Sequence, residues 1–299
     1  MKAITTQNPI DRIVTIVLDA VQSPNTRRAY GHALRDFMGW FATSGEGKLS
    51  KRVVRAYITY LRDTSTSAQS INLRLAAIKR LVYEAADNQA LSLTTAAAID
   101  RVERIKCEGQ RMGRRLSKEE VQAIMNRPSH DLKDLRDKAV LSVLFGAGLR
   151  RAECAVLQFD NIRMINARWV LVDITGKGNK IRSVPIAAWT KCAIDEWAAA
   201  AGISDGYIFR ALRRGGHITE NSMGAQAIYD VLVDLGIPCA PHDARRTMAQ
   251  LAHLGGCAIE QIQLTLGHSS ITTTQKYLGV KQNLTDAPCD HLGLSFSGD

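Results

Sequence analysis

Apolar side chains recur at helical spacing through the first hundred residues, and this periodicity limits what that part of the chain can form. In the segment TRRAYGHALRDFMGWFATSG, successive apolar positions Tyr30, Leu34, Phe37 and Phe41 are four, three and four residues apart. This spacing puts all of them on one face of an amphipathic helix, which two glycines then end. A strand would scatter the same residues over both of its faces, so the segment is predicted to be helical.

Two more helices of the same kind follow. Ser50 is suited to cap the first of them, whose inward residues are Val54, Tyr57, Ile58 and Leu61. The second begins near Ala68, and its apolar stripe is Ile71, Leu75, Ile78 and Val82. A shorter helical stretch is expected between residues 94 and 104. Residues 1–104 therefore predict a small helical bundle.

The outward face of this predicted bundle is basic. Residues 1–113 hold 17 Lys and Arg against 10 Asp and Glu, and the whole chain carries a net charge of +10. Such a positive field favours polyanionic partners such as nucleic acid or anionic lipid. A solvated helix surface is the alternative interpretation, but so many basic side chains favour contact with DNA phosphates. The predicted DNA-binding residues are Arg27, Arg28, Arg35, Arg52, Arg55, Arg74, Lys79 and Arg80.

A second domain is expected after a short linker. Residues 105–115 lack periodicity and carry two glycines among several basic residues, which is typical of a linker. Ser117, with Glu120 three residues later, forms a capping box that opens a new helix, so the second domain is predicted to span 116–299. It reads as mostly helical, with one hairpin in which RWVLVDI and KIRSVPI flank the turn TGKGN. The fold class is thus mainly α with a small β element.

Several classes of protein are disfavoured by what the sequence lacks. It has no run of 18 apolar residues, so no membrane span is expected. The apolar stretch near its start is broken by charged residues and has no cleavage site after it, so a cytoplasmic protein is expected. None of its six cysteines forms a CxxC pair, so no metal site is expected. It has no GxxxxGK[ST] loop, and nothing else suggests a cofactor.

Two separated segments carry basic groups suited to a phosphate. In LFGAGLRRAEC, Arg150 follows a glycine break and starts a helix, whose N-terminus favours an anion. Glu153, three residues further, can orient that guanidinium. Lys177 lies at the hairpin tip, where a mobile ammonium can reach into DNA. The ordinary alternatives are a surface ion pair for the first segment and a solvated basic turn for the second.

Two later segments carry histidines. In PHDARRTMA, His242 and Arg245 are three residues apart on one side of a helix, so both can face one phosphate. In LGHSSITTTQKYLGV, His268 follows a glycine turn, and the next helix carries Tyr277. The alternatives are a helix cap with a satisfied histidine, and an ordinary half-buried tyrosine.

Taken together, these segments resemble the tyrosine recombinase, or phage integrase, family, which includes Xer-type and integron recombinases. The family's signature is Arg, Lys, His-x-x-Arg, His or Trp, and then Tyr. In this chain the order is Arg150, Lys177, His242-x-x-Arg245, His268 and Tyr277. The strings GLRRAE, GKGNKIRSVPI and LGHSSITTTQKY are each similar to the family, and PNTRRAY with the bundle after it resembles the family's core-binding domain. One departure is Ala244-Arg245-Arg246, where the family often has Leu-Arg-His.

The resemblance implies a reaction in which DNA is cut by transesterification. Tyr277 would attack the scissile phosphate, form a 3′-phosphotyrosyl link and release a 5′-hydroxyl. A free phenol titrates near pH ~10, so it needs a base, for which His242 is the candidate. Lys177 would protonate the leaving oxygen. No metal or ATP is implied, because the covalent link conserves the energy of the phosphodiester.

The same resemblance assigns the remaining site residues to charge stabilisation. Arg150 and Arg245 would clamp the non-bridging oxygens, since a planar guanidinium donates two parallel hydrogen bonds. His268 would donate a further hydrogen bond. Glu153 would support the Arg150 side of the site.

The resemblance also implies an assembly. The two domains would form a C-shaped clamp on double-stranded DNA that carries a specific recombination site, and a homo-tetramer would hold two paired sites. The apolar residues of the tail would dock on a neighbouring protomer, unless the tail is merely a frayed end: Leu284, Leu292, Leu294 and Phe296. One alternative function is type IB topoisomerase-like relaxation, against which the Xer-like first domain and the tail argue. Another is a non-cutting DNA-binding regulator, against which the complete catalytic set argues.

Overall fold

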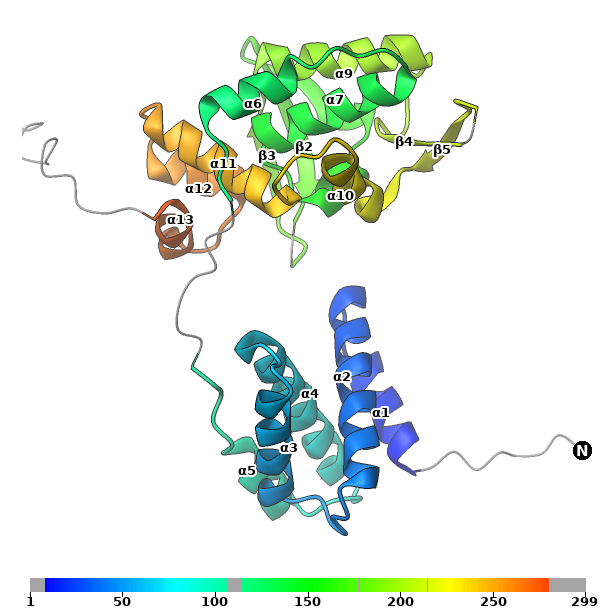
Figure 1. Cartoon of the computed structure of the whole chain (residues 1–299), viewed down its shortest axis with the longest axis vertical. Helices are drawn as coiled ribbons and strands as arrows, with labels where there is room; N and C mark the ends of the chain where they lie inside the picture. Colours follow the sequence, from blue (N-terminus) through cyan, green and yellow to red (C-terminus); the bar gives the residue numbers. More distant parts are fainter. Residues whose placement is uncertain (1–8, 107–113, 177, 214, 280–299) are drawn as a thin grey trace, which may run out of the picture. The chain divides into compact units, whose positions relative to one another are not determined.

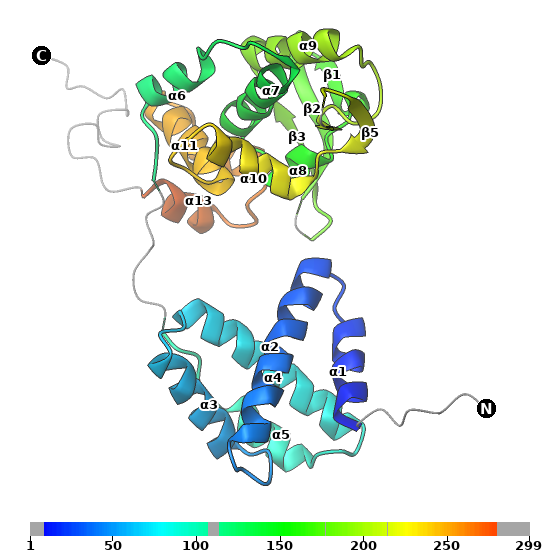
Figure 2. The same cartoon turned by 45° about the vertical axis from the view of Figure 1, so that its right-hand side comes forward.

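The chain divides into two compact units, Met1–Arg111 and Met112–Asp299 (Figures 1 and 2). The computed structural model describes residues 9–106, 114–176, 178–213 and 215–279. Most of the predicted linker, 107–113, lies outside these residues, so the domain boundaries stay a prediction. Within the described part, no helix is long and apolar enough to cross a membrane.

The first unit is a bundle of helices, as its periodicity predicts. Its described helices are α1 (Pro9–Asp19), α2 (Pro24–Thr43), α3 (Lys51–Asp63), α4 (Ala68–Asp87) and α5 (Leu93–Asp100). Ser50 caps α3 as expected, since its hydroxyl accepts a hydrogen bond from the backbone N–H of Val53. Helix α1 was not predicted, because charged residues interrupt its apolar stretch. Its apolar side, with Ile13 and Val17, is nevertheless buried in the bundle.

Aromatic side chains form part of the core of this bundle. Phe37 of α2 is fully buried and meets the ring of Tyr57 of α3 edge-on at 5.0 Å between centroids. Trp40 lies 5.1 Å from the same Tyr57 ring. These large contacts join α2 to α3, while Leu75 and Ile78 bring α4 into the same core.

The second unit surrounds a small sheet with helices. Its described helices are α6 (Lys118–Met125), α7 (Leu132–Gly146), α8 (Arg151–Ala155), the 3-10 turn η1 (Phe159–Asn161), α9 (Ala188–Ala201), α10 (Gly224–Asp234), α11 (Pro241–Leu254), α12 (Ile259–Leu266) and α13 (Ile271–Leu278). The predicted capping box opens α6: the Ser117 hydroxyl accepts from the Glu120 N–H, and the Glu120 carboxylate accepts from the Ser117 N–H.

The predicted hairpin is confirmed, and it is part of a larger sheet. Strands β2 (Arg168–Thr175) and β3 (Ile181–Pro185) are antiparallel, with Leu171 opposite Val184, and both of these side chains are buried. The structure adds strands that the sequence did not predict. Strand β1 (Ile162–Ile165) adds to the free side of β2, and β4 (Arg210–Leu212) with β5 (Ile218–Ser222) forms a separate pair. These strands are too short to give a clear alternating pattern.

The core of the first unit should depend strongly on Phe37. Replacing it with alanine removes a fully buried ring and leaves a cavity, so Phe37→Ala should lower the free energy of unfolding by about 3–5 kcal/mol. Urea unfolding followed by circular dichroism measures this loss. Tyr83→Ala is the control, because the Tyr83 side chain on α4 is 38% exposed. Equal losses in the two variants would contradict the packing described above.

Candidate active site

A tight turn after α7 delivers Arg150. Gly148 lies in the left-handed region at φ +61°, and a Cβ there would collide with the methyl group of Met248. Glycine therefore suits the conformation, and a larger residue would also displace the end of the Met248 side chain. The chain turns back at this point, and Arg150 becomes the N-cap residue of α8, which is the helix start that the sequence predicts.

One buried carboxylate holds the basic groups around it. Glu153 accepts hydrogen bonds from the backbone N–H of Arg150 at 2.8 Å and from its guanidinium at 2.7 Å, so the predicted contact is present. The guanidinium of Arg182 adds two more, at 3.0 and 2.8 Å. Burial raises the pKa of Glu153, but the hydrogen bonds from Arg182 and Arg150 outweigh it and bring the pKa below its ordinary value. Glu153 is therefore ionised at neutral pH.

Arg182 is a site residue that the sequence reasoning missed. It comes from β3, and its Nε donates to the carbonyl of Thr265 in α12 at 2.8 Å. Two glycines leave room for it. A Cβ at Gly267 would lie 2.9 Å from Arg182 Cδ, and one at Gly176 would lie 3.2 Å from its guanidinium. The available signal was alternation, because Arg182 shares a strand face with the buried Val184.

Arg245 is almost completely buried beside this cluster. Only 1% of its surface is exposed, and its guanidinium donates to the carbonyl of Gly148 at 2.6 Å and to the carbonyl of Leu266. Burial and the nearby charge of Arg150 lower the pKa of Arg245 to about 10. It still carries its charge at neutral pH, so both predicted arginines contribute positive charge to the site.

Tyr277 is in contact with both predicted histidines. Its ring meets His242 at 5.4 Å and His268 at 5.2 Å, edge-on in both cases. The hydroxyl is 3.4 Å from Nδ1 and 3.5 Å from Nε2 of His242, and it donates to the His242 carbonyl at 3.4 Å. The guanidinium of Arg246 covers the ring at 5.1 Å. Burial raises the pKa of Tyr277, and the charges of Arg245 and Arg246 oppose this only in part.

Both histidines are neutral at neutral pH. Burial, with the charges of Arg245 and Arg150, lowers the pKa of His268 to about 4. Its Nδ1 lies 3.0 Å from the hydroxyl of Thr274, which is fully buried. The pKa of His242 is also lowered, first by desolvation of its packed side and then by Arg246 and Arg245. A neutral imidazole can accept a proton, so His242 is in the form that a general base requires.

The remaining predicted site residues either lie outside the described residues or belong to the first unit. Lys177 and the apolar residues of the tail lie outside the described residues. The predicted DNA-binding residues that are exposed are Arg27, Arg28, Arg35, Arg52, Arg55 and Arg80. The expectation that Arg74 and Lys79 also face outward was wrong. Arg74 is paired with Asp36 at 2.9 Å and Lys79 with Asp100 at 3.5 Å, and both are partly buried.

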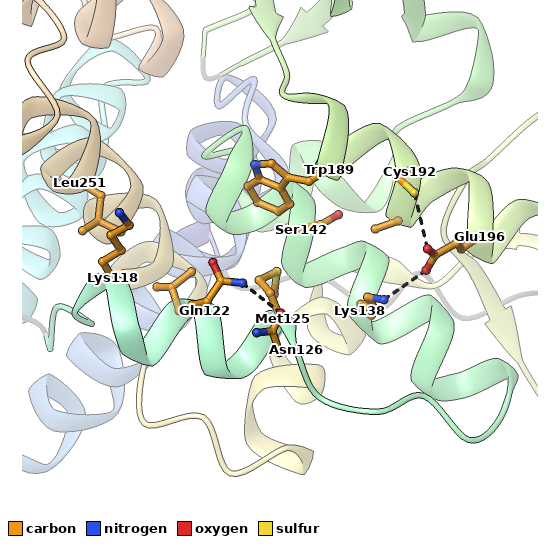
Figure 3. A pocket seen from close by; sticks show the side chains of 12 residues that line it. Lys118, Gln122, Met125, Asn126, Lys138, Ser142, Trp189, Cys192, Glu196 and Leu251 are labelled. Carbon is orange, nitrogen blue, oxygen red and sulfur yellow. Dashed lines mark hydrogen bonds and ion pairs between the residues drawn. The ribbon is translucent and has the colours of Figure 1, made fainter.

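A cavity elsewhere in the second unit is separate from this site. It has a volume of about 480 Å³ and lies among α6, α7 and α9 (Figure 3). Trp189 lines it, as do Lys138 and Glu196, which are joined by a hydrogen bond. None of the described candidate catalytic residues lines it. The candidate chemistry therefore belongs to the cluster around Tyr277 and not to this cavity.

Comparison with known proteins gives matches along both units. The Phage integrase family matches residues 114–283, and the N-terminal SAM-like domain of phage integrases matches residues 15–89. Tyrosine recombinase XerC of Pelobacter propionicus is 30% identical over 269 residues, which cover 86% of this chain and 85% of the relative. Tyrosine recombinase XerC of Haemophilus influenzae is 26% identical over 273 residues, with 87% and 88% covered.

The fold is also found among solved structures. XerH site-specific recombinase, bound to a palindromic difH substrate, has a TM-score of 0.68 at 15% identity, and the match covers 91% of each chain. At that identity the likeness shows the fold alone. The family matches and the Pelobacter relative, with the basic cluster around Tyr277, lead to one conclusion: the chain belongs to the phage integrase family and is a tyrosine recombinase.

Proposed function

We propose that this protein recombines DNA at specific sites by cutting and rejoining strands through a covalent bond to Tyr277. The observation that carries the proposal is the position of the Tyr277 hydroxyl, which lies against His242 in a pocket of positive charge. Helices α8, α11 and α13 supply this arrangement from distant parts of the sequence. A tyrosine with a purely structural role does not require a histidine at its hydroxyl and several arginines around it.

The first step is attack by the Tyr277 oxygen on the scissile phosphorus. Because burial raises the pKa of Tyr277, the phenol keeps its proton at neutral pH and needs a base. His242 is the nearest candidate and is itself neutral. The phenol proton passes to His242, the bond from phosphorus to the 5′-oxygen breaks, and Lys177 gives that oxygen a proton. Rejoining is the reverse reaction, with the 5′-hydroxyl as nucleophile.

Arg150, Arg245 and His268 would stabilise the charge that gathers on the non-bridging oxygens. Each fixed donor at such a position typically lowers the barrier by about 3–4 kcal/mol. Glu153 keeps the Arg150 guanidinium in place, and the same carboxylate holds Arg182. If the Thr274 hydroxyl donates to Nδ1 of neutral His268, the proton of that ring resides on Nε2, where it can be donated to a phosphate.

The DNA partner is proposed to be a duplex with a specific recombination site, which both units contact. The exposed arginines of α2 and α3 support contact between the first unit and DNA phosphates. The XerH relative was solved on a palindromic substrate, which favours paired binding of protomers, and we propose a homo-tetramer on two sites. We also propose that the protein acts on DNA in the cytoplasm. The match of the first unit to integrase N-terminal domains disfavours a type IB topoisomerase.

Tyr277→Phe should abolish the covalent DNA adduct and leave DNA binding nearly intact. The substitution removes only the nucleophilic oxygen, whereas binding rests on many phosphate contacts. Adducts are measured as SDS-resistant bands and binding by gel shift. Tyr229→Phe on α10 is the matched control, since its side chain is 37% exposed, and it should form adducts normally. An adduct from the Tyr277→Phe protein would refute the proposed nucleophile.

Thr274→Val should slow cleavage without weakening DNA binding. Valine keeps the buried shape but lacks the hydroxyl that orients His268. The loss should be roughly tenfold to hundredfold, because a misplaced donor forfeits a hydrogen bond to a charged group of about 1.5–3 kcal/mol. Thr273→Val on the same helix is the control, because Thr273 is exposed. Similar cleavage rates in the two variants would show that Thr274 does not act through His268.

Lys177→Ala should be rescued by a better leaving group. If Lys177 protonates the 5′-oxygen, a 5′-bridging phosphorothiolate should restore cleavage, since sulfur leaves without a proton. Arg150→Ala should stay defective on the same substrate, because its guanidinium serves the non-bridging oxygens. Single-turnover cleavage of both substrates by both variants measures this. Rescue of both variants, or of neither, would mean that the two roles are wrongly assigned.

A further inference from the structure

The carbonyl end of α13 is bonded to a side chain from the start of the second unit. Arg115 donates from one guanidinium nitrogen to the carbonyl of Tyr277 at 2.9 Å, and from another to the carbonyl of Leu278 at 3.4 Å. The first of these carbonyls belongs to the proposed nucleophile itself. Arg115 therefore holds the backbone of the residue whose side chain is proposed to react.

The end of α13 has a physical need for such a donor. The last carbonyls of a helix have no partner within the helix. Gly279 ends α13 in the left-handed conformation at φ +67°, and its N–H is bonded to the carbonyl of Gln275. That bond does not serve the carbonyls of Tyr277 and Leu278. A guanidinium meets both with its planar fork, and its positive charge suits the negative end of the helix dipole.

The backbone beside Arg115 is anchored to the helix that carries the proposed base. Leu116 is buried, and its N–H donates to the hydroxyl of Thr247 on α11 at 3.1 Å. His242 lies in the first turn of the same α11. Residues 115 and 116 therefore connect two helices. Helix α11 bears the proposed base, and α13 bears the proposed nucleophile. It fixes the backbone of α13 with respect to α11.

This connection matters because the contact between nucleophile and base is loose. The Tyr277 hydroxyl is 3.4 and 3.5 Å from the ring nitrogens of His242, near the outer limit for a hydrogen bond. Helix α13 has only eight residues, and it packs through Tyr277 and Leu278 against a small apolar cluster. A small turn of α13 would carry the hydroxyl out of reach of His242.

We propose that Arg115 is a positioning residue, which holds the Tyr277 backbone so that the hydroxyl stays against His242. The proposal rests on the proposed function, in which Tyr277 is the nucleophile. Arg115 acts through Tyr277 and not on the phosphate, so its loss should slow the chemical step and spare DNA binding.

The test is Arg115→Ala in the full chain, with Arg114→Ala as the matched control. Arg114 carries the same charge but pairs with Glu120 at 2.9 Å on an exposed surface. The single-turnover rate of adduct formation is measured at saturating protein, and DNA affinity is measured separately. Arg115→Ala should form the adduct roughly tenfold to hundredfold more slowly, as small misplacements of reacting groups do, with unchanged affinity. Arg114→Ala should match the unmodified protein in both measurements.

A conservative variant separates positioning from general stability. Arg115→Lys keeps a charged donor that reaches one carbonyl, so its rate should lie between those of the alanine variant and the unmodified protein. A normal rate in Arg115→Ala would overturn the proposal. So would a slow rate that comes with a parallel loss of DNA affinity and melting temperature in both Arg115 variants, because that pattern indicates a purely structural role. An adduct formed by Tyr277→Phe is a different result, since it refutes the nucleophile instead.

Discussion

The Glu153 carboxylate is the interaction on which the rest of the site depends. It is buried, yet four hydrogen bonds from Arg150 and Arg182 keep it charged. Breaking a buried ion pair from one side leaves an uncompensated charge, which is strongly destabilising. Through this one anion, α8 is joined to β3, and through the Arg182 bond to Thr265, β3 is joined to α12. Without this carboxylate, nothing would offset the repulsion between the positively charged guanidinium groups of Arg150 and Arg182.

Desolvation and a surplus of positive charge together explain the state of the neighbouring groups. Desolvation lowers the pKa of both His242 and His268 most, and nearby arginines lower it further: Arg246 and Arg245 act on His242, and Arg245 and Arg150 act on His268. The site is thus electrostatically incomplete until an anion enters. A phosphodiester would supply the missing negative charge, and it would make a proton on His242 less costly than in the free protein. Entry of an anion and the ability of His242, the proposed base, to take up a proton are therefore coupled.

The sequence predicts those features that depend on neighbours in the chain. The helix stripes and the caps at Ser50 and Ser117 are local, and the structure confirms them. Helix α1 is not predicted because charged residues interrupt its apolar pattern, and the additional strands are not predicted because they are too short to show alternation. The candidate catalytic residues are predicted because they follow the order of the family signature along the chain. The contacts of Arg182 and Arg115 could not be predicted, because their partners are distant in the sequence. Arg115 and Tyr277, for example, are 162 residues apart.

The sheltered state of Tyr277 has a consequence for the protein while it is idle. The hydroxyl is bonded to the His242 carbonyl, and only 9% of the tyrosine surface is exposed. Small electrophiles and nitrating oxidants attack phenols from solvent, so exposed rings such as Tyr60 would be modified first. Between encounters with DNA, chemical modification should therefore affect exposed side chains first, while the oxygen of the proposed nucleophile is protected.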